Sequence, residues 1–344
     1  MLHRIPAAAW LAAAHLTAAP LAAQHGVPAP DGAQVTVVSL DPRFERLVPK
    51  GTTVELIASG FAWVEGPAWD RQGRRLLFTD IPNNVVYAWS EGQGVRVFLK
   101  PSGYSGAAPF PGPEPGANGL AFDRSGHLLL CQHGDRRIAR QEPDGRLVTV
   151  ADRFEGKRLN SPNDVFVAPN GDLFFTDPPF GLPKQFDDPG QELGFTGVYR
   201  VGRDGKLTLL SRDLTAPNGV ALSPSGRTLY VSNADLRNPI WMAFDVAPDG
   251  SLRNQRVFHD GRAEAAGAAG VPDGMDIDRD GNLFAAGPGA VYVFAPDGTL
   301  LGRINFGIAV SNTAWGDDGS TLYITASTGV YRMKLRTRGL GFPG

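Results

Sequence analysis

Six residues with a side-chain oxygen open six similar segments of the sequence, and their recurrence suggests a site that binds a cation. The segments read EGPAWD, NGLAFD, NDVFVA, NGVALS, DGMDID and NTAWGD, and their first residues are Glu65, Asn118, Asn163, Asn218, Asp273 and Asn312. Asn-Gly and Asp-Gly are also common turn dipeptides, which is the alternative interpretation of any one copy. Glu is a poor turn residue, however, and an oxygen in all six copies favours a functional ring.

A ring of carboxylate and amide oxygens suits a hard divalent cation. Calcium is the first choice, because it binds about six to eight oxygen ligands of these kinds. Glu65 and Asp273 would balance its charge, and the amides of Asn163 and Asn218 would complete the protein ligands. No histidine cluster with zinc spacing accompanies them, but magnesium, manganese and zinc stay open. Positions left to water or substrate would make the ion catalytic.

Such a ring requires a fold that brings six equivalent segments to one axis. Each segment is followed by a turn containing Gly and by further short runs rich in Val, Leu, Phe and Tyr, which is typical of β-strands. The first strands start 39 to 55 residues apart, the period of a four-stranded propeller blade. We therefore predict an all-β, six-bladed β-propeller with four-stranded blades, in which the first strands line the central channel.

The sixth copy ends after its third strand, so the fourth strand of the last blade must come from elsewhere. TTVELIAS, residues 52–59, is the predicted N-terminal strand, and its pairing would close the ring and remove an exposed sheet edge. The predicted catalytic propeller domain covers residues 40–344, and residues 24–39 are predicted to be a flexible lead-in.

The first 23 residues have the layout of a secretory signal peptide: Arg4, a stretch of Ala, Leu and Trp, and small residues before Gln24. Export to the periplasm or the medium is therefore predicted, with no membrane insertion after cleavage. A single membrane anchor is the alternative, but this apolar run contains His15 and Pro20 and is short for a span.

Composition narrows the classes of partner and chemistry. The net charge of −2 and the pI near 6.3 argue against a nucleic-acid partner. Cys131 is the only cysteine, so no intramolecular disulfide can form, and its place among leucines predicts a buried, inert thiol. No Ser lies in a Gly-x-Ser-x-Gly motif, so a serine-hydrolase mechanism has no support. The oligomeric state is left open.

Polar residues at the ends of the second strands should reach the same face as the oxygen ring: Asp80, His133, Asp177 and Asn233. The long loops 102–117, 178–195 and 261–272 should lie there too, as expected where a rigid scaffold carries a site. His133 is interpreted either as a proton-transfer or substrate-binding group or as a hydrogen-bonded structural histidine. Asp80 and Asp177 are predicted to stabilise turns.

The motifs EGPAW, IPNN, ANGLAFD, CQHGDRRIAR, LNSPNDV, FTDPPFG, APNGVALSPSG and PDGMDID occur in this order. Together they resemble the family of senescence-marker protein, gluconolactonase and luciferin-regenerating enzyme, most of all its bacterial gluconolactonase branch. The resemblance implies a six-bladed propeller with a divalent metal in its channel, and lactone hydrolysis. Glu65, Asn163, Asn218 and Asp273 fall on the family's metal positions. Asn163 falls also on a substrate-contacting position and Asp273 on the proton donor or acceptor, whereas Ser161 stands where some members have an arginine.

The hypothesis from sequence is metal-assisted opening of a sugar-type lactone such as gluconolactone to the hydroxy acid. Asp273 is the leading general base, Asp164 and His133 are further candidates, and Asn118 and His133 are expected to contact the substrate. A second calcium deeper in the channel would use Asp276. The alternatives are the same scaffold acting on another electrophile, such as a phosphotriester, or a non-catalytic binding module with a structural calcium.

Overall fold

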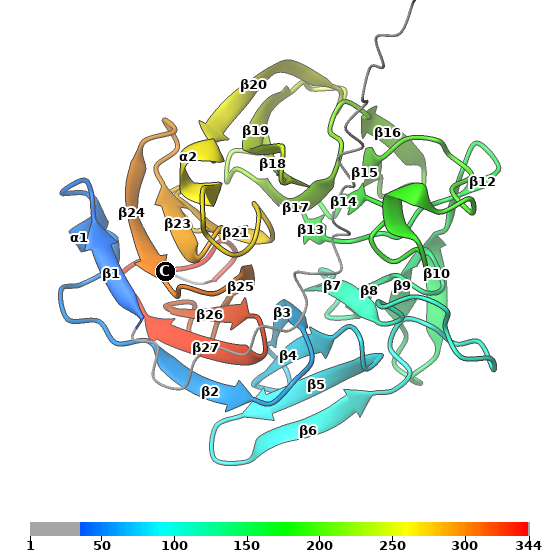
Figure 1. The fold of residues 1–344 in the computed structure, drawn as a ribbon, viewed down its shortest axis with the longest axis horizontal. Helices are drawn as coiled ribbons and strands as arrows, with labels where there is room; N and C mark the ends of the chain where they lie inside the picture. Colours follow the sequence, from blue (N-terminus) through cyan, green and yellow to red (C-terminus); the bar gives the residue numbers. More distant parts are fainter. Residues whose placement is uncertain (1–34, 343–344) are drawn as a thin grey trace, which may run out of the picture.

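The computed structural model describes residues 35–342, in which six antiparallel sheets stand around a central axis (Figure 1). The predicted six-bladed β-propeller is confirmed. The predicted signal peptide, residues 1–23, and residues 24–34 lie outside the described part of the chain. Within residues 35–342, no helix is long and apolar enough to cross a membrane.

The first three blades are regular four-stranded meanders. Blade 1 consists of β3 (Val64–Asp70), β4 (Arg75–Asp80), β5 (Val85–Ser90) and β6 (Gly94–Leu99). Blade 2 consists of β7 (Ala117–Phe122), β8 (Leu128–Gln132), β9 (Arg137–Gln141) and β10 (Leu147–Ala151). A small hairpin, β11 (Arg153–Phe154) and β12 (Lys157–Arg158), leads to blade 3, which consists of β13 (Val165–Val167), β14 (Leu173–Asp177), β15 (Gly197–Val201) and β16 (Leu207–Ser211).

The other three blades share this order, with the first strand nearest the axis (Figure 1). Blade 4 consists of β17 (Pro217–Leu222), β18 (Thr228–Asp235), β19 (Asn238–Val246) and β20 (Leu252–Asp260), followed by α2 (Arg262–Ala265). Blade 5 contains β21 (Met275–Ile277), β22 (Leu283–Gly287), β23 (Ala290–Phe294) and β24 (Leu300–Asn305). Blade 6 contains β25 (Val310–Gly316), β26 (Thr321–Ala326) and β27 (Gly329–Lys334).

Two N-terminal strands complete the last two blades. β2 (Glu55–Ser59) pairs antiparallel with β27, so the prediction that residues 52–59 close the ring is confirmed. β1 (Thr36–Ser39) pairs with β24 and gives blade 5 a fifth strand. The prediction of a flexible lead-in is therefore wrong for Thr36–Ser39, because the free edge of β24 offers backbone groups with which this segment pairs. Between these strands, α1 (Phe44–Leu47) buries two apolar side chains.

Glycines at the starts of the inner strands allow neighbouring blades to meet closely at the axis. A Cβ on Gly66, where φ is +49°, would lie 2.1 Å from the backbone oxygen of Asn118. A Cβ on Gly219 would lie 2.3 Å from the backbone oxygen of Asp273. The Gly of the repeated Glu-Gly, Asn-Gly and Asp-Gly pairs is therefore required for packing between blades. The interpretation of these pairs as turn dipeptides does not account for this role.

Hydrophobic side chains on the faces of the sheets fill the spaces between neighbouring blades. Trp241 of blade 4, for example, is fully buried against Tyr292 and Phe294 of blade 5. Cys131 is likewise buried, in the cluster between blades 2 and 3, and burial raises its pKa well above the ordinary value. The predicted buried thiol is confirmed.

Candidate metal and substrate site

A small cavity of about 50 Å³ lies where the inner strands begin, at one end of the central channel. The inner strands contribute polar residues to it and the surrounding loops contribute mostly apolar ones. Its lining consists of Trp63, Glu65, Ile81, Glu114, Asn118, Asn163, Phe180, Gln185, Asn218, Ala234, Val271 and Asp273.

All four predicted metal ligands line this cavity: Glu65, Asn163, Asn218 and Asp273, called the ligand set below. Each of them is buried. Asn163 Oδ1 and Asp273 Oδ1 are buried acceptors with no hydrogen-bond partner among the described residues. Leaving such an acceptor unpaired is costly, so these two oxygens fit direct contact with a cation.

The ligand set carries a concentration of negative charge. Burial raises the pKa of Glu65 to about 8, opposed by the hydrogen bond from the Gly66 amide and reinforced by the nearby carboxylate of Asp164. Burial, followed by the charge of Glu65, raises the pKa of Asp273 well above its ordinary value. No Lys, Arg or His is among the residues that line the cavity within the described chain. A divalent cation would supply the missing positive charge.

Bulges interrupt the regular ladder at the starts of three inner strands, where Asn118 and Asn218 lose their cross-strand partners and Glu65 stays paired with Thr79. In β7 the register shifts between Ala117 and Leu120, so Asn118 has no partner in β8. The register of β17 shifts in the same way around Asn218, and that of β3 shifts directly after Glu65. A bulge bends a strand and changes the direction of the side chains it carries, and bulges are common beside active sites.

Asn312 differs from the other five positions of the predicted ring. The register shift in β25 comes before it, so Asn312 stays paired with Thr325. Its Nδ2 donates to Glu65 Oε2 at 3.1 Å, and its Oδ1 accepts from the Thr313 amide at 2.8 Å. Asn312 is not part of the cavity lining. The prediction that all six oxygens converge is therefore wrong at this position, where the amide instead supports Glu65.

The deeper carboxylates of the channel tie blades together. Asp164, a candidate base, accepts hydrogen bonds from the amides of Val165 at 3.0 Å and Val220 at 3.3 Å. Asp276 accepts from the amides of Ile277 at 2.7 Å and Trp315 at 3.2 Å. Neither carboxylate lines the cavity. Among the described residues no group of three or more His, Cys, Asp and Glu has a metal-binding arrangement, so the ligand set depends on its two amides.

His133 is also absent from the lining, but it contacts a residue that belongs to it. The His133 side chain is fully buried, and its Nδ1 lies 3.1 Å from Glu114 Oε2. Sequence reasoning missed Glu114, which stands between two prolines in the loop 102–117. The only available signal was an acidic residue in a loop expected at the site.

Residues at the ends of the second strands hold the segments that enter the inner strands. Asp80 accepts hydrogen bonds from the amides of Ala62 at 3.2 Å and Trp63 at 3.3 Å. Asp177 accepts from the amides of Asn160 and Ser161, both at 2.8 Å. Both carboxylates are structural, but these amides lie 16 to 18 residues earlier in the chain, so the carboxylates hold the incoming segments and not, as predicted, a local turn.

Two further side chains hold the same kind of segment. Asn233 Oδ1 accepts a hydrogen bond from the Ala216 amide at 2.9 Å. The Ser161 hydroxyl donates to the backbone oxygen of Pro178 and accepts from the Gly181 amide. Ser161 thereby anchors the loop 178–195 and does not line the cavity.

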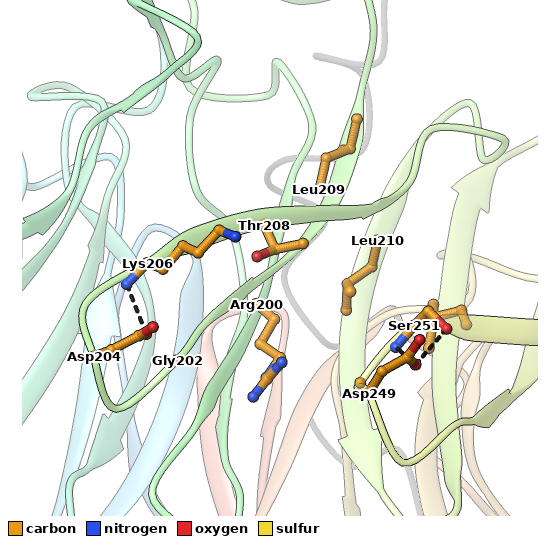
Figure 2. Close-up of a pocket in the computed structure, with 11 residues that line it drawn as sticks. Arg200, Gly202, Asp204, Lys206, Thr208, Leu209, Leu210, Asp249 and Ser251 are labelled. Atoms are coloured by element: carbon orange, nitrogen blue, oxygen red, sulfur yellow. Dashed lines mark hydrogen bonds between the residues drawn. The ribbon is translucent and has the colours of Figure 1, made fainter.

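A wider groove of about 440 Å³ lies on the opposite face, between the turns that join the third and fourth strands of blades 3 and 4 (Figure 2). Its acidic side chains stabilise their own turns: Asp204 accepts from the Lys206 amide, and Asp249 accepts from the amide and hydroxyl of Ser251. Arg200 is paired with Asp172 at 2.6 Å. These groups do not converge on a common point, so we assign the functional site to the channel cavity.

The chain is similar to known gluconolactonases in sequence and in fold. The chain matches the model of the "SMP-30/Gluconolactonase/LRE-like region" over residues 63–328. It is 40% identical over 343 residues to a gluconolactonase of Zymomonas mobilis, covering 97% of this chain and 95% of the relative. The structure of XC5397, a gluconolactonase from Xanthomonas campestris, superposes with a TM-score of 0.76 at 32% identity, over 90% of this chain and 99% of that one.

A more distant neighbour supports the fold alone. A calcium-binding protein, regucalcin, from Agrobacterium tumefaciens gives a TM-score of 0.65 at 21% identity, over 85% of this chain and 97% of that one. The family match spans the inner strands of all six blades and every residue of the ligand set. The chain belongs to the SMP-30, gluconolactonase and luciferin-regenerating enzyme family.

Proposed function

We propose that this protein is a lactonase, dependent on a divalent metal, that opens a sugar-type lactone such as gluconolactone to its hydroxy acid. The observation that carries the proposal is the ligand set, with two buried unpaired oxygens, in a chain 40% identical to a gluconolactonase. The carboxylate and amide oxygens of the ligand set make calcium the first candidate for the metal.

The residues present fit such a metal. The carboxylates of Glu65 and Asp273 and the amide oxygens of Asn163 and Asn218 would hold it, and the unpaired Oδ1 atoms of Asn163 and Asp273 support this choice. When bound, the metal supplies a Lewis acid that polarises the lactone carbonyl. Glu65 is oriented for its part by the Gly66 amide, 2.8 Å from Oε2, and by the Asn312 amide.

Asp273 is the general base in this proposal. Its carboxylate lines the cavity, where burial, followed by the charge of Glu65, raises its pKa well above the ordinary value in the metal-free protein. It accepts a proton as water adds to the lactone carbonyl carbon. The C–O bond of the ring then breaks, and the proton passes to the ring oxygen, which becomes the hydroxyl of the hydroxy acid. Asn118 and Asn163 line the cavity beside this reaction.

The cavity itself restricts what can reach the reacting atoms. Trp63, Ile81, Phe180 and Val271 contribute apolar surface around the ligand set. These walls limit the number of water molecules and strengthen electrostatic interactions within the site.

The experiment is metal analysis of the purified chain combined with a lactone panel, with and without a chelator. We expect lactone hydrolysis that is lost with the chelator and restored by one divalent cation. Turnover that persists without metal would exclude the metal-assisted mechanism. Turnover of a phosphotriester but of no lactone would favour the other electrophile, and no turnover of either would favour a binding module.

We also propose that the mature chain is exported, on the basis of residues 1–23. Cell fractionation with N-terminal sequencing of the native protein tests this. A mature N-terminus near Gln24 in the periplasm or medium is expected, whereas an intact N-terminus in the cytoplasm would contradict export.

A further inference from the structure

Glu114 is the charged residue of the cavity that does not come from an inner strand. It lies in the loop 102–117, before β7, and only 5% of it is exposed. Its neighbours in the lining include the apolar side chains of Trp63, Ile81 and Phe180. Burying a carboxylate in such surroundings is costly unless polar groups pair with it, so the polar groups beside Glu114 indicate what it does there.

His133 holds this carboxylate in place. Its Nδ1 lies 3.1 Å from Glu114 Oε2, and its ring packs so closely against Gly181 that a Cβ there would lie 2.5 Å from His133 Cγ. The backbone amide of His133 donates to the oxygen of Gly116, in the segment that follows Glu114. Neither ring nitrogen of His133 makes a hydrogen bond of regular geometry within residues 35–342, so the 3.1 Å approach of Nδ1 to Glu114 Oε2 is a close polar contact. This contact places the buried ring directly beside the carboxylate.

An ionised carboxylate only accepts hydrogen bonds, so its matching substrate groups are donors. The ring hydroxyls of a polyhydroxylated lactone are such donors, and the apolar walls suit the carbon framework of the ring. The other polar residues of the lining outside the ligand set, Asn118 and Gln185, carry no charge. Glu114 therefore offers the strongest acceptor for hydroxyl groups in the wall of the cavity.

We propose that Glu114, positioned by His133, is a specificity-determining residue that accepts hydrogen bonds from the ring hydroxyls of a polyhydroxylated lactone. This inference rests on the proposed lactonase function and assigns to one residue its preference for lactones that carry hydroxyl groups. Glu114 selects the substrate, whereas the ligand set and Asp273 act on its carbonyl.

The test compares glucono-1,5-lactone with δ-valerolactone, which has the same ring size without hydroxyls, in the wild type and in Glu114→Gln. For gluconolactone we expect kcat/KM to fall about 10- to 100-fold, mainly through KM, because a hydrogen bond to a charged group is lost. For δ-valerolactone and for metal content we expect no change. His133→Asn should shift gluconolactone kinetics in the same direction, and the double variant should be no worse than Glu114→Gln alone.

The matched control is Glu264→Gln. Glu264 Oε1 pairs with His259 Nε2 at the same 3.1 Å, but neither residue lines the cavity. This variant should leave both substrates unaffected. An equal loss for both lactones, or a loss of metal, in Glu114→Gln would overturn the proposal, because Glu114 would then act on the reaction or the metal. Unchanged kinetics for both lactones would overturn it as well.

A failure of the lactonase proposal is recognised separately, because the wild type would then hydrolyse neither lactone. In that case titration calorimetry with 1,5-anhydroglucitol, a hydroxylated ring without a carbonyl, decides the role of Glu114. Weaker binding by Glu114→Gln than by the wild type would support the proposal, and equal binding or no binding by the wild type would refute it.

Discussion

Replacing Glu65 by Gln should stabilise the metal-free protein but weaken the metal-bound one. Glu65 is only 3% exposed, and burial is the main cause that raises its pKa from 4.5 to about 8. Without metal, the folded protein keeps this proton at pH values where the unfolded chain has lost it, so stability falls as the pH rises from 4.5 towards 8. By pH 7 this loss amounts to about 3 kcal/mol. Gln has no proton to lose and avoids the loss.

With a divalent cation bound, the same substitution removes one of the two charges that oppose the cation. Breaking a buried charge pair costs about 3–5 kcal/mol, so we expect the Kd for calcium to rise about 10²- to 10⁴-fold. The Gln side chain can still accept the hydrogen bonds that Gly66 and Asn312 donate to Glu65 Oε2, so the local geometry should persist. The stability difference between variant and wild type should therefore change sign between chelator and calcium.

The assay is urea unfolding at pH 7 in chelator and in calcium, with calorimetry for the calcium affinity. Repeating the chelator series at pH 4.5 should abolish the stabilisation by Gln. Asp278→Asn is the control: this buried carboxylate accepts hydrogen bonds from Asn282 and Thr337 and does not line the cavity, so its replacement should change the stability by the same amount in chelator and in calcium. Unchanged calcium affinity, or a variant less stable than wild type in chelator, would refute the reasoning.

Three further predictions concern the metal site and the strands and segments that support it. Calcium affinity of the wild type should rise between pH 6 and 8, because the cation competes with protons for Glu65, whose pKa is raised to about 8; calorimetry at three pH values checks this, and a flat profile would contradict it. Asp177→Asn should lower the free energy of unfolding in urea by about 1–3 kcal/mol, because its NH₂ group would face a backbone amide of Asn160 or Ser161 that needs an acceptor. The substitution should also lower calcium affinity by displacing Asn163, and an unchanged affinity would show that this segment does not position the ligand. Deleting β2 should expose the edge of β27 and abolish cooperative unfolding, whereas a monomer that unfolds cooperatively would show that ring closure is dispensable.

The blade pattern could be predicted because each blade is built from neighbouring segments of the chain. The strands of a blade follow one another through short turns, so the alternation of apolar runs and Gly-containing turns is visible in the sequence itself. Repetition then indicated that Glu65, Asn163, Asn218 and Asp273 occupy equivalent places near the axis. The closing strand β2 was predictable for a related reason, since the last repeat lacked one strand.

Contacts between blades could not be read in this way. Whether a polar residue at the start of an inner strand faces the cavity depends on where the bulge of that strand lies, and the bulge before Asn312 turns this residue towards Glu65. Asp164 is adjacent in sequence to Asn163 but is held by Val220 of the next blade.

The sequence by itself determined the number of blades, the residues near the axis and the excess of carboxylates among them, because these follow from a repeat whose interactions are local. Only the tertiary structure decided which of those oxygens stay unpaired. It also decided that Glu114 lines the same cavity, with His133 in contact with its carboxylate. The physical reason is that the burial and the hydrogen-bond partners of each of these side chains depend on how all six blades pack together. Glu114 and His133 flank the β7–β8 hairpin, in which Ala117 pairs with Gln132, so the hairpin brings their segments together, and the packed loop before β7 places the Glu114 carboxylate 3.1 Å from His133 Nδ1.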